Sequence, residues 1–86
     1  MAEGAPLSVL CITSYEKGAE LMRACKRLGC SVYLLTVTAL DQADWPRASL
    51  DDVFYMPDLS DLPAVTNAVS YLARTHIIDR IVALDD

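Results

Sequence analysis

The sequence predicts an α/β fold, namely a Rossmann-like open parallel sheet of about four strands. Four short apolar runs rich in strand-forming residues recur along the chain, and amphipathic stretches with helical spacing follow the first and the third run. Each strand-helix-strand crossover in a parallel sheet must be right-handed to pack back on the sheet. This alternation favours the strand order 3-2-1-4, with one helix on each face.

The first strand-helix-strand unit begins with an apolar run at residues 7–12 and ends with another at residues 31–37. Both runs are typical of strands buried on two faces. Thr13 and Glu16 have the spacing of a capping box, so we expect the helix to begin within a residue or two of the first strand. Gly29 ends this helix. Its apolar stripe contains Leu21, Met22, Cys25 and Leu28.

The middle of the chain is expected to form a long connection and a third strand. Residues 38–51 have no hydrophobic period, and Pro46 keeps Trp45 out of helical geometry. We predict a connecting loop, with room for one helical turn, in which the Trp45 side chain is buried. Residues 52–57 form the third strand, which Pro57 ends.

A second helix is predicted over residues 61–75, followed by a fourth strand at residues 80–86. Ser60 or Asp61 is the expected N-cap, and Pro63 lies in the first turn, where its missing N–H costs nothing. The apolar stripe of this helix contains Leu62, Val65, Val69, Leu72 and His76.

The domain organisation expected from these elements is a disordered tail at residues 1–6 and one domain at residues 7–86 that is incomplete at its C-terminus. The last strand has the composition of a strand buried on both faces, yet no later residue covers it. A four-stranded parallel sheet with one helix on each face is also only half covered. We therefore expect a fragment that continues past Asp86 and is marginally stable or self-associates, as in a homodimer.

Composition excludes several classes of function. The net charge is -5, and the seven Lys and Arg residues are dispersed among acids, so the chain has no basic stripe for nucleic acid. The apolar runs are far shorter than the roughly 20 residues of a membrane span, and the N-terminus lacks the basic region of a signal peptide. A cytoplasmic protein is the expectation. The three cysteines fit no common zinc or redox spacing and are interpreted as reduced packing residues, so no metal site is predicted.

The candidate binding site is the crevice beyond the carboxyl ends of the first and fourth strands, where the strand order reverses. Residues of the turn after the first strand and of the end of the fourth strand are its substrate-crevice candidates: Thr13, Ser14, Tyr15, Asp85 and Asp86. Adjacent acids on a strand point to opposite sides, so one of the two aspartates faces the crevice and can accept hydrogen bonds from an amine or amide. No residue is assigned a catalytic role, because neither Ser14 nor His76 has an evident catalytic partner.

Standard nucleotide motifs are absent from the turn after the first strand. The three glycines of a dinucleotide fingerprint would fall at Thr13, Tyr15 and Gly18, and only Gly18 matches. The sequence has no P-loop, and the acids follow the fourth strand rather than the first, unlike those of a phosphorelay receiver.

Three segments resemble the amino-terminal domain of ATP-grasp enzymes, also called the pre-ATP-grasp or biotin-carboxylase N-terminal-like domain. They are "LMRACKRLGCSVYLLT", "DWPRASLDDVFYMPDL" and "IDRIVALDD", and the resemblance extends from about residue 6 to residue 86. The run "RACKRLG" is similar to the first helix of biotin carboxylase. The turn after the first strand differs from those of the D-alanine ligase and biotin-carboxylase branches, so the resemblance does not assign a substrate.

The resemblance implies the amino-terminal, substrate-side domain of a ligase that joins a carboxylate to an amine or another nucleophile through an acyl phosphate, with ATP hydrolysis. ATP and Mg²⁺ would be bound mainly by further domains of the same chain, and this fragment alone would not be catalytic. The crevice candidates would border the pocket for a carboxylate or amine substrate. The alternative is a stand-alone Rossmann-like module that binds a small molecule or a protein without catalysis.

Overall fold

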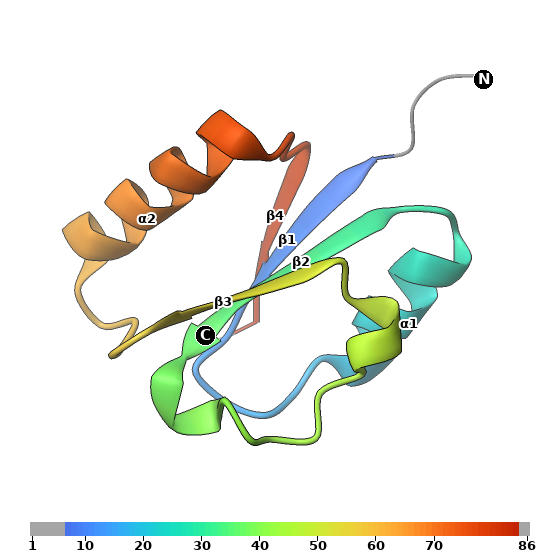
Figure 1. Cartoon of the computed structure of the whole chain (residues 1–86), viewed down its shortest axis with the longest axis horizontal. Coiled ribbons are helices and arrows are strands. Elements are labelled where there is room, and N and C mark those ends of the chain that lie inside the picture. The colour runs from blue at the N-terminus through green and yellow to red at the C-terminus, as the bar shows by residue number, and fades with distance from the viewer. Residues whose placement is uncertain (1–6, 85–86) are drawn as a thin grey trace.

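In the computed structural model, which describes residues 7–84, the chain forms a four-stranded parallel sheet in the order β3-β2-β1-β4 (Figure 1). This confirms the predicted α/β fold and the predicted strand order. The elements are β1 (Ser8–Ile12), α1 (Ala19–Arg27), β2 (Ser31–Val37), β3 (Asp52–Met56), α2 (Leu62–Thr75) and β4 (Arg80–Ala83). The tail expected at residues 1–6 and the acids Asp85 and Asp86 lie outside the described residues.

The two helices lie on opposite faces of the sheet (Figure 1). On the α1 face, alternate side chains of β1 and β2 pack with Met22 and Trp45 in a core cluster that contains Val9, Cys11, Met22, Val32, Leu34 and Trp45. On the other face, Leu72 of α2 is buried near Leu35 of β2. This arrangement confirms the prediction of one helix on each face.

Helix α1 begins later than the sequence predicts. The capping box is wrong, because the N-cap is Gly18 and the helix opens at Ala19, six residues beyond Thr13. The Thr13 hydroxyl bonds to the backbone of Tyr15 instead of capping the helix. Leu28, predicted on the buried stripe, is the C-cap residue and is 82% exposed.

Residues 38–51 form the predicted connection, which contains two short 3-10 turns rather than one, at Thr38–Leu40 and Arg47–Ser49. Trp45 is 4% exposed, and its indole Nε1 donates to the Leu40 carbonyl at 3.0 Å. The predicted burial of Trp45 is therefore confirmed. This side chain ties the connection to the α1 face of the sheet.

Helix α2 begins as predicted, with Asp61 accepting a hydrogen bond from the Ala64 amide. The structure selects Asp61 over Ser60 as the N-cap. Leu62, expected on the buried stripe, is 72% exposed, because the helix closes on the sheet toward its C-terminal half, where Leu72 is buried.

Strand β4 does not have the predicted burial on both faces. Ile81 is 53% exposed, and Ala83 on the same side of the strand is also exposed. Because α2 lies against β2 and β3, it leaves this side of the edge strand β4 uncovered.

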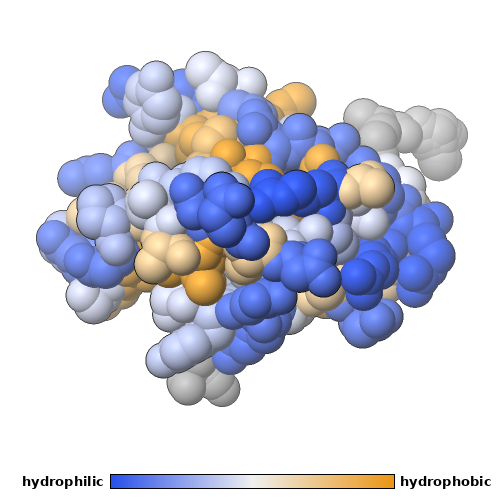
Figure 2. Space-filling model, turned by 60° about the horizontal axis from the view of Figure 1, so that its bottom comes forward, coloured by the Kyte–Doolittle hydropathy of each residue, from blue (hydrophilic) through white to orange (hydrophobic). Residues whose placement is uncertain are grey.

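Figure 2 turns the bottom of Figure 1 forward and shows a largely hydrophilic face with separate apolar patches. Within residues 7–84, no helix combines the length and apolarity that crossing a bilayer requires.

Candidate functional site

The strand order reverses between β1 and β4, so the crevice expected of an open parallel sheet lies beyond their carboxyl ends. The turn of residues 13–18 leaves β1 there, and Leu84 follows β4. The Leu84 amide donates to the Ile12 carbonyl at 2.9 Å, which extends the pairing of the two strands to this edge. Of the five predicted crevice residues, the structure describes Thr13, Ser14 and Tyr15.

Thr13 anchors the turn after β1. It is fully buried, and its amide donates to the Leu35 carbonyl of β2 at 3.2 Å. Its hydroxyl donates to the Tyr15 carbonyl and accepts from the Tyr15 amide, both at 3.1 Å. Because these bonds hold its hydroxyl, Thr13 shapes the crevice wall rather than presenting a polar group to a ligand.

Tyr15 is the exposed member of the predicted group. Its residue exposure is 62%, and the ammonium of Lys17 lies 5.4 Å from the centre of its ring. Ser14 is half-buried between Thr13 and Tyr15. The turn thus offers one aromatic ring with an adjacent cation at the rim of the crevice.

Gly18 and Leu84 bring the two sides of the crevice into contact. Gly18 has φ 88°, a conformation that favours glycine. A Cβ atom at this position would overlap the Cδ1 atom of Leu84. Glycine is therefore needed here for two reasons, and the turn after β1 packs directly on the end of β4.

A second buried threonine lies beside Thr13. Thr36 of β2 is one register step beyond the paired residues Ile12 and Leu35, and it is fully buried. Its hydroxyl is the one buried side-chain polar atom without a hydrogen-bond partner among the described residues. Such a group costs about 1–3 kcal/mol. The sequence gives no signal for Thr36, because a threonine in a strand is an ordinary β-branched residue.

Acids dominate the connections that leave the carboxyl ends of the strands. Apart from Asp51, which lies at the start of β3, the described acids there are Glu16, Asp41, Asp44, Asp58 and Asp61, and the bases are Lys17 and Arg47. Hydrogen bonds from the hydroxyl and the amide of Ser60 lower the pKa of Asp58, which keeps this carboxylate ionised. This edge attracts cationic groups more than phosphates.

The first turn of α1 has mixed properties for an anion. The N-cap Gly18 provides no side-chain acceptor for the first amides of the helix, which favours an anion there. Glu20 opposes an anion, because it places a carboxylate in the first turn. This carboxylate already complements the positive end of the helix and pairs with Arg23 at 3.2 Å. A phosphate at this helix end would meet a like charge.

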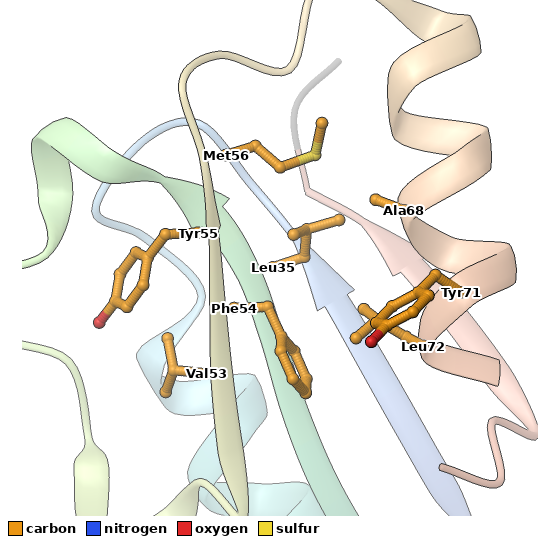
Figure 3. A pocket seen from close by; sticks show the side chains of 8 residues that line it. All are labelled: Leu35, Val53, Phe54, Tyr55, Met56, Ala68, Tyr71 and Leu72. Carbon is orange, nitrogen blue, oxygen red and sulfur yellow. The ribbon is translucent and has the colours of Figure 1, made fainter. Parts of the chain in front are cut away.

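A hollow of about 400 Å³ lies elsewhere, between α2 and strands β2 and β3. Figure 3 shows side chains from β2, β3 and α2 around it, with Tyr55 and Val53 on the far side of β3. Its lining is mostly apolar and contains Leu35, Val53, Phe54, Tyr55, Met56, Ala68, Tyr71 and Leu72. The volume is in the range of small-molecule pockets.

His76 lies near this hollow but at the amino ends of the strands, away from the crevice. Its ring meets Tyr33 and Phe54 edge-on, with centroid distances of 5.0 and 5.2 Å. Its Nε2 atom is 3.5 Å from a carboxylate oxygen of Asp52, a partner that the sequence did not reveal. The His76 ring therefore packs against the sheet at the end of α2, and the His76 amide donates to the Leu72 carbonyl at 2.8 Å.

Neither a cluster of metal ligands nor a similar known protein assigns a function to the site. Across residues 7–84, no group of three or more His, Cys, Asp or Glu side chains is arranged to hold a metal ion. No family model, curated protein or solved structure matches this chain.

Proposed function

We propose that this chain is the amino-terminal, substrate-side domain of a cytoplasmic ATP-grasp ligase and that its β1–β4 crevice borders the pocket for an amine substrate. The observation that carries the proposal is the reversal of strand order between β1 and β4, on a sheet edge whose connections contain more acids than bases. The resemblance of three sequence segments to the pre-ATP-grasp domain supplies the reaction class.

In this proposal the chain contributes substrate positioning and further domains contribute the chemistry. ATP and Mg²⁺ bound by those domains would convert a carboxylate to an acyl phosphate, which the amine then attacks with release of phosphate. The acidic edge favours an ammonium group over a phosphate. Thr13 holds the turn in place through its three hydrogen bonds, and Tyr15 presents an exposed ring to the substrate.

The decisive experiment uses the product of the whole reading frame that encodes these residues. We expect ADP to form only when a carboxylate and an amine are both present, and we expect Tyr15→Ala to raise the KM for the amine several-fold. Tyr71→Ala is the matched control, because Tyr71 is 64% exposed and Tyr15 is 62% exposed. ADP formation without an amine requirement, or a reading frame that ends at Asp86, would overturn the proposal.

The second candidate is a stand-alone Rossmann-like module that binds a small molecule without catalysis. The apolar hollow between α2 and β3 favours it, because about 400 Å³ is enough for a small ligand. Titration of the 86-residue chain with small aromatic acids and amines, followed by NMR, distinguishes the two sites. Shifts at Phe54 and Met56 support the second candidate, whereas shifts confined to residues 13–18 support the first.

A further inference from the structure

Helix α1 ends in a Schellman turn whose two end positions are both cysteines. Gly29 has φ 89° just after the helix, and its amide donates to the Lys26 carbonyl at 3.0 Å. The Cys30 amide donates to the Cys25 carbonyl, also at 3.0 Å. These two bonds define the motif, in which the side chains at the two ends commonly touch.

The backbone bond between Cys25 and Cys30 limits the distance between their Cα atoms. A carbonyl oxygen lies about 2.4 Å from its own Cα, and an amide nitrogen about 1.5 Å from its own Cα. With the 3.0 Å hydrogen bond between them, the two Cα atoms are less than about 7 Å apart. Disulfides span Cα separations of about 4.4–6.8 Å. The limit on the Cα separation of Cys25 and Cys30 is therefore compatible with a disulfide.

The two thiols also share one environment. Both residues are partly buried and pack against the core cluster on the α1 face. Burial raises the pKa of Cys25, and the neighbouring Cys30 thiolate raises it further, as expected for sulfur groups within electrostatic reach. Cys11 is fully buried below them, and burial raises its pKa to about 11. The third thiol is therefore shielded and almost entirely protonated.

We propose that Cys25 and Cys30 form a dithiol site that a small-molecule disulfide oxidises to an intramolecular disulfide. The Cys30 thiolate attacks one sulfur of the small disulfide, whose S–S bond breaks, so that a mixed disulfide forms and one small thiolate leaves. Cys25 then gives its proton to solvent and attacks the Cys30 sulfur, which expels the second small thiolate. The protein loses two electrons and two protons, and the small disulfide becomes two thiols.

The order of the two steps follows from burial. Burial disfavours the Cys25 thiolate, so we assign the first attack to Cys30 and the closing step to Cys25. Closure becomes faster as the pH rises toward the raised pKa of Cys25. The product would lock the left-handed turn at Gly29, which joins α1 to β2 at the edge of the sheet opposite the crevice. The proposal is therefore independent of the ligase function.

The test treats the native 86-residue chain with oxidised glutathione, quenches with acid and counts free thiols by alkylation and mass spectrometry. We expect the protein mass to fall by two hydrogen atoms and one of the three thiols to remain free. Trypsin cleaves after Lys26 and Arg27, between the two cysteines, so the map should show peptide 24–26 linked to peptide 28–47. The wild-type map identifies the pair even where a variant folds poorly.

Variants separate this pair from the other possible pairs. Cys11→Ala should close the same bond. Cys25→Ser should stop at a mixed disulfide that carries one glutathione, and Cys30→Ser, which lacks the first attacking thiol, should form its mixed disulfide more slowly than Cys25→Ser. A wild-type product that stays a mixed disulfide, links Cys11, or forms only between two chains would overturn the proposal.

Discussion

Among single residues, Asp51 and Asp79 make the same pair of hydrogen bonds at the starts of β3 and β4. The Asp51 amide donates to the Val32 carbonyl at 2.7 Å, and the Asp51 carboxylate accepts from the Val32 amide at 2.7 Å. Asp79 makes the equivalent bonds with Ser8, at 2.9 and 2.8 Å. Each aspartate directly precedes its strand and fastens it to a neighbouring strand.

Asp51 also accepts from the ammonium of Lys26 at 2.6 Å, and this bond is the main reason why the pKa of Asp51 is lowered. We expect Asp51→Asn to reduce the free energy of unfolding by about 1 kcal/mol at neutral pH, a modest value because both side chains are more than a third exposed. Chemical denaturation of both proteins measures this difference.

The pH dependence of this loss has a definite sign. A carboxylate whose pKa is lowered by folding stabilises the protein above its unfolded pKa of about 3.9 and loses this effect as the pH falls through the folded value. The difference between wild type and Asp51→Asn should therefore shrink below about pH 4. Asp44→Asn, at an exposed loop acid, is the control. A difference that is unchanged in strong acid would contradict this account.

Two glycines with positive φ provide a second test at this scale. Gly18→Ala and Gly29→Ala should each cost about 1–2 kcal/mol for the left-handed conformation. Gly18→Ala should cost more, because its Cβ overlaps Leu84 while nothing lies within 4 Å of a Cβ at Gly29. Thermal unfolding gives both values. Adding Leu84→Ala should remove the excess, and equal losses at the two glycines would argue against the contact.

At the scale of elements, the start of α1 shows why a capping box can mislead. The spacing of Thr13 and Glu16 matches the motif, but Thr13 lies at the end of a strand, where its amide pairs with Leu35 of β2. Its hydroxyl is used within the turn by Tyr15. Because Thr13 pairs with the sheet and bonds within the turn, it cannot also cap the helix. Tertiary pairing therefore overrode the local capping signal.

Helix α2 has a cap that the sequence narrowed to two residues. Asp61→Ala should reduce the free energy of unfolding by about 1 kcal/mol, because the Ala64 amide loses its acceptor. Ser60→Ala should have a smaller effect, since the Ser60 hydroxyl donates to Asp58 and does not cap the helix. Urea titration measures both variants. A larger loss at Ser60 would show that the cap assignment is wrong.

In the molecule as a whole, the two faces of the sheet are covered unequally. The α1 face contains the core cluster with Met22 and Trp45. The α2 face has a hollow between helix and sheet, and β4 leaves Ile81 53% exposed. Large apolar side chains on α2 and after it are also open to solvent: Leu62, Tyr71 and Ile77. Exposed apolar surface of this kind favours contact with another protein surface.

This uneven cover predicts marginal stability with self-association of the 86-residue chain. We expect the denaturation midpoint to rise with protein concentration, because association stabilises the folded state by mass action. Sedimentation should show a concentration-dependent mass, and Ile81→Thr should reduce it by removing apolar surface from β4. A midpoint that is high and independent of concentration would contradict the prediction.

The fold was more predictable than the site. The strand order 3-2-1-4 is the usual one for a doubly wound sheet, and the buried Trp45 and the cap at Asp61 follow from local chemistry. Within the site, the sequence located the turn after β1 but not the role of its residues. The sequence did not reveal that the Thr13 hydroxyl bonds within the turn, and it gave no signal for Thr36. The expected ligands Asp85 and Asp86 lie outside the described residues.

The sequence by itself determined the alternation of strands and helices. A buried face requires apolar residues at every second position of a strand and about every 3.6 positions of a helix, and this spacing is visible in the sequence. Only the tertiary structure decided which distant residues meet. It joined Ser8 to Asp79, set Leu84 against Gly18 and left one side of β4 uncovered. These outcomes depend on where whole elements pack in space, and a local period contains no information on that.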